Sequence, residues 1–197
     1  MSQRPIFPLN MTLFPGGRLP LQIFETRYID MLKDCFRNNT GFVIVSIKDG
    51  HEVGLRPETY TIGTYAEIID WSTLPSGLLG ITVEGRERVK LTEITEAEDK
   101  LLTAQTEFID AEVAVPVPAA YLHLVKILKS IKDNPVIQNL NLNIDYQNAS
   151  ELSCRLSELL PFDIEDKQAL LELQDPIERL ARVQAILDVM GASFNIE

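Results

Sequence analysis

Residues 19–28 read LPLQIFETRY and join an extended apolar stretch to the start of a helix. From residue 26 to residue 38, apolar side chains recur at the three- and four-residue spacings that place them on one face of an α-helix. These side chains are Ile29, Leu32, Cys35 and Phe36. The sequence therefore predicts one helix over residues 26–38, with this face turned toward a core.

Four side chains around the start of this helix fit two roles. Phe24 and Tyr28 have the spacing of a hydrophobic staple, in which a residue before a helix packs against one in its first turn. Glu25 is favoured by the helix dipole near the N-terminus of the helix. Glu25 and Arg27 fit an ion pair with the neighbouring strands as well as a contact with a ligand. Both roles stay open, so Phe24, Glu25, Arg27 and Tyr28 are candidate binding residues.

Short strand-like segments surround this helix in the sequence. Residues 42–47, FVIVSI, are almost uninterrupted apolar residues, which is typical of a strand buried on both faces. Further segments with strand patterning lie at residues 6–9, 62–69, 79–83, 88–92 and 102–108. Pro8 in the first of them suits an edge strand, because proline cannot donate a ladder hydrogen bond. This series of short strands predicts a barrel or a sandwich.

Trp71 is the only tryptophan of the chain and follows residues 68–70 at the end of a predicted strand. Tryptophan is highly buried on average, which favours a packing role at the edge of the core. An exposed anchor at a binding surface is the alternative. Because both interpretations fit the sequence, Trp71 is the fifth candidate binding residue.

The hydrophobic period changes from two to about 3.6 after residues 113–118, VAVPVP. Two prolines at such a change favour a boundary between domains. Beyond them the pattern is that of amphipathic helices, and Asp175-Pro176 is a typical helix start with a cap and a proline at the first helical position. The predicted fold class is therefore α+β, with a β-barrel domain at residues 1–115 and a helical bundle domain at residues 116–197.

The charge balance argues against polyanionic partners. The 197 residues include 29 acidic and 18 basic ones, a formal net charge of -11, and neither half is basic. Nucleic acid and anionic membranes usually require a local surplus of Lys and Arg, so nucleic acid is an unexpected partner. No apolar run approaches the ~20 residues of a membrane span, and residues 1–5 lack the apolar region of a secretory signal. We therefore expect no membrane association and a cytoplasmic location.

Motifs that carry catalysis are missing from the sequence. It contains no G-x-x-x-x-G-K-[ST], no G-x-G-x-x-G and no G-x-S-x-G. His51 and His123, the only histidines, have no partners at the spacing of a zinc site. Cys35 and Cys154 lie far apart, which favours two reduced, buried thiols. The sequence thus predicts no catalytic residue, no metal, no cofactor and no enzymatic activity.

Three segments near the N-terminus resemble a known family. They are residues 5–9 (PIFPL), 13–16 (LFPG) and 19–28, and they are similar to the N-terminal, substrate-binding domain of the ATP-dependent Lon proteases. The resemblance continues at residues 52–54, 62–64, 85–89, 159–161 and 167–172 and covers nearly the whole chain. Two positions depart from the free-standing relatives: Gln22 stands where they often carry His, and Thr26 where they often carry Pro.

This resemblance implies a PUA-like β-barrel with one inserted helix, followed by an α-helical bundle. It also implies a stand-alone domain of bacterial type, because 197 residues cannot hold the ATPase and Ser-Lys protease modules of the whole protease. The implied function is a non-catalytic module that binds polypeptide segments or a protein partner, for example exposed apolar segments of unfolded proteins. An apolar surface of this kind can also be closed by a second copy, so the chain is expected to be a monomer or a homodimer.

Two alternatives stay open at this point. One is an RNA-binding PUA-like domain, for which Arg86, Arg88 and Lys90 on one predicted strand are the best candidate patch. Fold analogy alone supports it. The other is a small-molecule binder or an enzyme, which a deep pocket with a titratable group of strongly shifted pKa would favour.

Overall fold

The computed structural model describes residues 2–52 and 56–191. The chain forms two compact units, Met1–Asp110 and Ala111–Glu197. The division falls after Asp110 rather than after residue 115, the boundary expected from the sequence. The assignment of the two units as separate domains stays a prediction.

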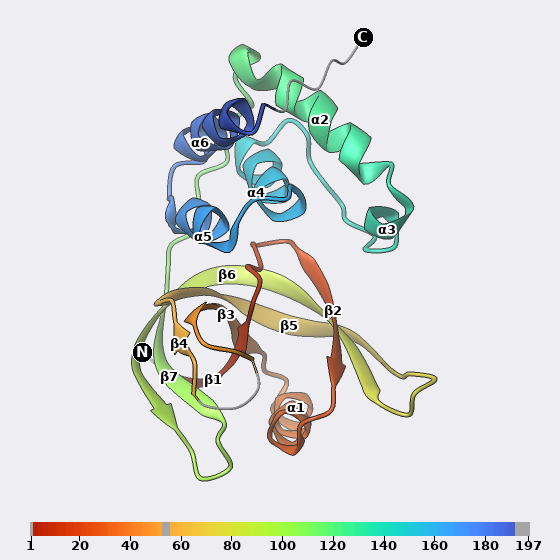
Figure 1. Cartoon of the computed structure of the whole chain (residues 1–197), viewed down its shortest axis with the longest axis vertical. Helices are drawn as coiled ribbons and strands as arrows, with labels where there is room; N and C mark the ends of the chain where they lie inside the picture. The colour runs from red at the N-terminus through yellow and green to blue at the C-terminus, as the bar shows by residue number, and fades with distance from the viewer. Residues whose placement is uncertain (1, 53–55, 192–197) are drawn as a thin grey trace. The chain divides into compact units, whose positions relative to one another are not determined.

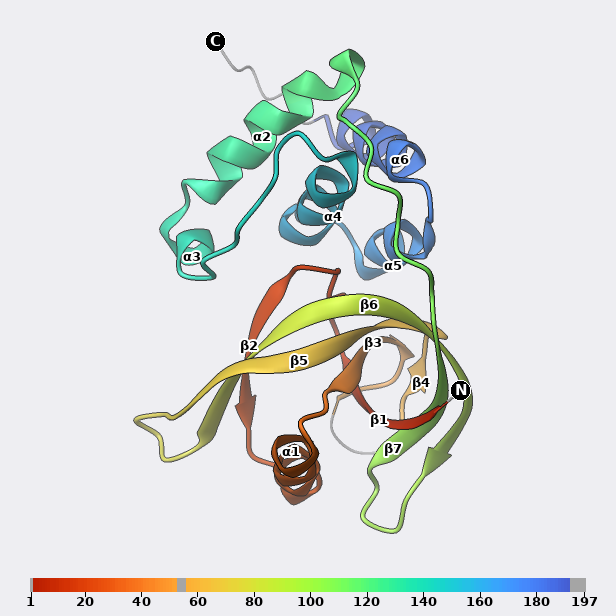
Figure 2. The same cartoon turned by 180° about the vertical axis from the view of Figure 1, so that it is seen from behind.

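The first unit is a sheet that closes into a ring, accompanied by helix α1 (Thr26–Asn38) (Figures 1 and 2). Its strands are β1 (Ser2–Leu9), β2 (Arg18–Ile23), β3 (Phe42–Asp49), β4 (Glu58–Thr59), β5 (Ile62–Thr73), β6 (Leu79–Glu96) and β7 (Leu102–Phe108). Their order is β1-β7-β6-β5-β3-β4, and β2 lies beside β6. The parallel pairing of β1 with β3 closes the ring, because it joins two strands from separate places in this order. A barrel with one inserted helix was the expected arrangement.

Each half of strand β1 has a neighbour on one side only, which agrees with the edge position that Pro8 suggested. Residues Ser2–Ile6 pair antiparallel with β7, and residues Ile6–Leu9 pair parallel with β3. Each half of β1 is thus paired along one side. Proline is tolerated there because its missing N–H can fall on the unpaired side of the strand.

Strand β6 runs unbroken through residues 79–96, where the sequence pattern indicated two separate segments. It pairs with β5 over residues 79–90, with β2 in its first half and with β7 in its second half. The interruption of the pattern at Gly85 marks a close approach of the chain. A Cβ at Gly85 would lie 2.4 Å from the carbonyl oxygen of Phe14. The glycine therefore allows the turn at residues 14–17 to cross β6.

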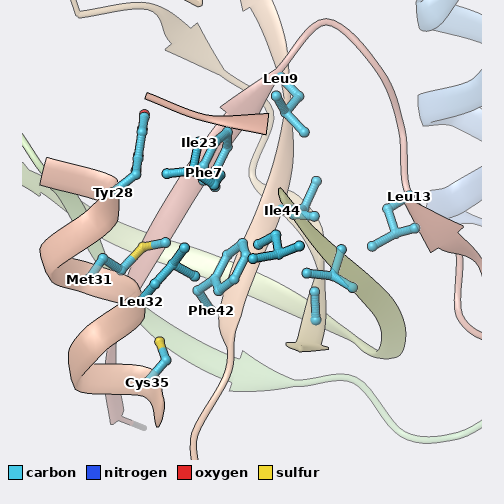
Figure 3. Packing of buried hydrophobic residues seen from close by; sticks show 13 residues of the cluster. Phe7, Leu9, Leu13, Ile23, Tyr28, Met31, Leu32, Cys35, Phe42 and Ile44 are labelled. Carbon is cyan, nitrogen blue, oxygen red and sulfur yellow. The ribbon is translucent and has the colours of Figure 1, made fainter. Parts of the chain in front are cut away.

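The first unit has two buried hydrophobic clusters, one among strands β1, β3, β6 and β7 and one in which α1 packs against strands (Figure 3). The buried face of α1 consists of Tyr28, Met31, Leu32 and Cys35. These residues follow the i, i+3, i+4, i+7 pattern of one helical stripe. Phe36 was expected in this face, but it is 47% exposed because it lies beside the stripe rather than in it. Burial of each large apolar side chain here contributes about 1.5–3 kcal/mol.

The second unit is helical, as the change of period predicted. Its elements are η1 (Ala119–Tyr121), α2 (Leu122–Lys132), α3 (Pro135–Gln138), α4 (Ala149–Leu159), α5 (Ile164–Glu172) and α6 (Pro176–Val189). The predicted cap of α6 is confirmed, since the Asp175 carboxylate accepts the N–H of Ile177 at 2.8 Å. Helix α4 packs against α2, α5 and α6 and forms the centre of the unit.

A buried ion pair fixes the segment that leads into the helices. Arg179 of α6 is 0% exposed, and its guanidinium binds the Glu112 carboxylate. The same guanidinium donates to the carbonyl oxygen of Leu170 at 2.8 Å and to that of Leu173. Glu112 also accepts the Ser150 hydroxyl at 2.5 Å. These bonds attach the start of the second unit to α4, α5 and α6.

Candidate functional site

The candidate residue Tyr28 lies in the core of the first unit. It is 6% exposed, and its ring stacks on the ring of Phe7 with centroids 4.0 Å apart. Burial raises the pKa of the Tyr28 hydroxyl above its ordinary value, although the neighbouring Arg27 acts in the opposite direction. The hydroxyl is therefore protonated at neutral pH, and most of the side chain has a packing role.

Glu25 and Arg27 bind each other. The Arg27 guanidinium lies 2.7 Å from the Glu25 carboxylate and donates to the carbonyl oxygen of Lys100 at 2.8 Å. Its central carbon also lies 4.7 Å from the centre of the Tyr28 ring, a cation–π distance. Of the two roles that the sequence left open, the structure displays an ion pair that ties the start of α1 to the β6–β7 turn.

Phe24 does not form the predicted staple. Its side chain is 61% exposed, whereas Tyr28 packs on Phe7 instead. A large apolar side chain directly before α1 is thus left in solvent. Its proposed role in binding stays a prediction.

Trp71 is exposed as well, at 63%, and is not part of the core; its role in binding stays a prediction. Its ring meets that of Phe36 edge to face, with centroids 6.2 Å apart and an interplanar angle of 64°. Phe36 comes from the last turn of α1, and Trp71 comes from the C-terminal half of β5. We call these two side chains the aromatic surface. The helical spacing of Phe36 predicted a place in the core. Only its position beside the buried helical stripe could have indicated that it is exposed.

A pocket of about 260 Å³ adjoins Trp71 where β2, β6 and β5 lie side by side. Gly80 of β6 is opposite Gln22 on one side and opposite Ser72 on the other. Because Gly80 has no side chain, Leu74 folds over it, and a Cβ at this position would lie 2.9 Å from a Leu74 methyl group. The pocket extends the aromatic surface with apolar groups of Pro20, Leu21 and Leu74.

Charges on α1 are paired locally. Lys33 binds Asp30 at 2.8 Å, and Arg37 binds Asp34 at 2.9 Å. Such exposed pairs contribute about 0–1 kcal/mol to stability. They leave the helix beside the aromatic surface without a dominant sign of charge.

The predicted basic patch on β6 does not form. Arg86 is bound by two carboxylates, with Glu67 at 2.7 Å and Glu84 closer still. Arg88 is 4% exposed and thus lies inside the unit. Of the three, Lys90 alone extends freely from the strand. A phosphate backbone would meet one exposed cation here rather than a row of them.

Metal ligands and thiols are two further kinds of group that could carry chemistry. Within residues 2–52 and 56–191, no group of three or more His, Cys, Asp or Glu side chains is placed to hold a metal ion. Cys35 and Cys154 are both buried and outside any disulfide, in agreement with the prediction of two buried thiols. Burial raises the pKa of the Cys35 thiol, the direction expected of an unreactive cysteine. No helix of this part of the chain has both the length and the apolar character that crossing a bilayer requires.

Known Lon proteases are similar to almost all of this sequence. The Lon protease of Buchnera aphidicola subsp. Baizongia pistaciae is 29% identical over 195 residues, which covers 93% of this chain and 24% of that protein. The Lon protease of Solibacter usitatus is 26% identical over 203 residues, covering 98% of this chain and 25% of that protein. The chain therefore spans about a quarter of the length of these relatives.

Solved structures confirm the predicted α+β fold class. A Lon N-terminal domain protein from Xanthomonas campestris superimposes with a TM-score of 0.78 at 24% identity, over 94% of this chain and 98% of that one. The N-terminal domain of a Mycobacterium avium complex Lon protease gives a TM-score of 0.59 at 14% identity, over 98% of this chain and 100% of that one. The model of the ATP-dependent protease La (LON) substrate-binding domain matches residues 3–189. The chain belongs to this family of Lon substrate-binding domains.

Proposed function

We propose that this chain is a non-catalytic module that binds exposed apolar segments of unfolded or partner polypeptides. The single observation that carries the proposal is the aromatic surface: Phe36 and Trp71 come from different elements, touch each other and still lie largely in solvent. Membership in the Lon substrate-binding family supports polypeptides as the ligand class.

The energetics favour this assignment. Aromatic side chains can bury 150–250 Å² each, at about 25 cal/mol per Å² of apolar area removed from water. Exposed apolar groups that cluster beside a pocket commonly mark interaction surfaces. An apolar side chain of an extended ligand can lie against Trp71 and reach the neighbouring pocket of about 260 Å³. Because the charges on α1 are paired, shape and apolar contact dominate this proposed recognition.

The five residues singled out in the sequence divide into two groups under this proposal. Trp71 and Phe24 are contacts for the ligand, since both are exposed. Glu25, Arg27 and Tyr28 act by positioning, because they hold the start of α1 against the ring. A cytoplasmic location, and a monomer or a homodimer, belong to the proposal as well. The activity of a whole Lon protease is not assigned to a chain that spans a quarter of one.

Fluorescence anisotropy of a labelled, permanently unfolded protein titrated with this chain tests the proposal. A folded protein and an RNA, labelled in the same way, are the parallel ligands. We expect saturable binding to the unfolded protein alone. Trp71→Ala should weaken it about tenfold or more, the size of an interface hot spot.

Val136→Ala is the matched control, since Val136 is a 70% exposed apolar residue of the second unit. The affinity of this variant for the unfolded protein should equal that of the wild type. Equal binding of folded and unfolded protein, or Trp71→Ala binding like the wild type, would contradict the proposal. Circular dichroism of each variant verifies that it is folded.

A further inference from the structure

A second pocket lies beside the start of α1, away from the aromatic surface. We call it the α1 pocket; its volume is about 210 Å³, the size of a single small group rather than of a drug-sized ligand. Buried residues of its lining include Pro8, Tyr28 and Leu102, and the charged residues of its lining are Arg27, Glu52, Arg56, Glu96 and Lys100. Residues 53–55 lie outside the described part of the chain.

The Tyr28 hydroxyl is the central feature of the α1 pocket. Figure 3 shows the Tyr28 ring against Phe7, with its oxygen directed away from the other side chains of the cluster. The side chain is 6% exposed, and no hydrogen bond joins this oxygen to any other described residue. The oxygen is open to the pocket, so the hydroxyl offers a hydrogen-bond donor to a ligand bound there. The raised pKa of Tyr28 keeps that donor protonated.

Charges of both signs lie around this hydroxyl, and two of the three cations, Lys100 and Arg56, are outside the Glu25–Arg27 ion pair. Lys100 has no ion-pair partner within the described part of the chain, and its backbone carbonyl is held by Arg27. Arg56 uses one nitrogen to bind the carbonyl oxygen of Ile94 at 3.0 Å, so the rest of its guanidinium is available. Two carboxylates oppose them. Of these, Glu52 already accepts the N–H of Asn10 at 2.7 Å, and Glu96 is exposed.

We propose that the α1 pocket binds a carboxylate group. Its two oxygens accept the Tyr28 hydroxyl and a charge-assisted bond from Lys100 or Arg56, which is the stronger class of hydrogen bond. The apolar groups of Pro8 and Leu102 pack against the carbon chain that carries the carboxylate. The C-terminus of a polypeptide and a free amino acid share this chemistry.

A nitrogen-15 NMR titration of the whole chain with three probes tests the inference. The probes are N-acetyl-Ala-Leu with a free carboxylate, the same dipeptide as its C-terminal amide, and free leucine. The free-carboxylate dipeptide should cause saturable shifts of the backbone N–H signals of Arg27, Tyr28 and Lys100. The amidated dipeptide should cause no shifts. Equal binding of free leucine assigns the pocket to a small amino acid, and its failure assigns the pocket to a polypeptide C-terminus.

Tyr28→Phe retains the ring that stacks on Phe7 and removes only the hydroxyl. This substitution should weaken binding of the free-carboxylate dipeptide about tenfold, the effect of one hydrogen bond to a charged group. Lys100→Gln should weaken it too, whereas Lys90→Gln, an exposed lysine of β6, should not. Trp71→Ala should leave this binding unchanged, which separates the inference from the proposed function. Equal shifts with the amide, or unchanged affinity of Tyr28→Phe, would overturn it.

Discussion

Phe36 of α1 and Trp71 of β5 meet edge to face, with ring centroids 6.2 Å apart and an interplanar angle of 64°. Both rings remain largely in solvent, at 47% and 63% exposure. The pair thus presents an exposed apolar face built from two elements. Aromatic side chains have few rotatable bonds, so they lose little conformational entropy when they bind an apolar ligand.

The exposure of Trp71 has a direct spectroscopic consequence. Because it is the only tryptophan, the tryptophan fluorescence of the folded chain comes from this one side chain. Its emission should lie near that of tryptophan in water, and iodide should quench it at least half as well as it quenches the unfolded chain. A blue-shifted emission that resists iodide would contradict the described position of Trp71.

Replacing one partner of the buried Arg179–Glu112 pair should strongly lower the free energy of unfolding. Arg179→Met leaves the Glu112 carboxylate buried and uncompensated, which costs about 3–5 kcal/mol of unfolding free energy. Arg182→Met on the same helix is the control. Its partner Asp166 lies 3.2 Å away in a largely exposed pair, so it should cost less than about 1 kcal/mol. Urea unfolding of both variants gives the comparison, and equal losses would rule out this role of Arg179.

Gly41 should tolerate no side chain. A Cβ there would lie 2.0 Å from the carbonyl oxygen of Ala66, a backbone atom that cannot move aside without disturbing the pairing of β3 with β5. Gly41→Ala should therefore lower the unfolding free energy by more than about 3 kcal/mol, beyond the usual range of overpacking. Gly77→Ala is the comparison: space is open around it, and its φ of +81° alone costs about 1–2 kcal/mol. The reverse order of stabilities in urea would contradict the close approach at Gly41.

The stability of the first unit should depend on pH through Tyr28. Its pKa is raised in the folded chain by burial, so above pH ~10 the unfolded chain releases this proton more readily than the folded one. Stability is then lost as the pH rises through this range. Tyr28→Phe cannot ionise, so its stability relative to the wild type should increase between about pH 9 and pH 11. A difference between the two proteins that stays constant over this range would show that the hydroxyl is not buried.

Local patterning explains how much of this fold was predictable. The 3.6-residue recurrence predicted α1 at its observed bounds, Thr26–Asn38, and the apolar run at residues 42–47 predicted a buried strand. Both signals depend on neighbours in sequence. The parallel pairing of β1 with β3 and the stacking of Tyr28 on Phe7 depend on segments that only the closed ring brings together.

The candidate site was less predictable than the fold. Trp71 could be singled out because a lone tryptophan is conspicuous, but its partner Phe36 has helical spacing that fits the core equally well. The α1 pocket joins Tyr28 to Lys100, which is 72 residues later in the chain and belongs to the β6–β7 turn. No sequence pattern indicates that these two side chains meet.

The emission of Trp71, followed while an unlabelled, permanently unfolded protein without tryptophan is added, tests the central claim most directly. We predict a blue shift that saturates at the dissociation constant measured by anisotropy, together with protection from iodide, because the bound segment covers the aromatic surface. A folded protein at the same concentrations should change neither signal. Binding detected by anisotropy while the emission and iodide quenching of Trp71 stay constant would contradict the claim, because the ligand would then bind elsewhere.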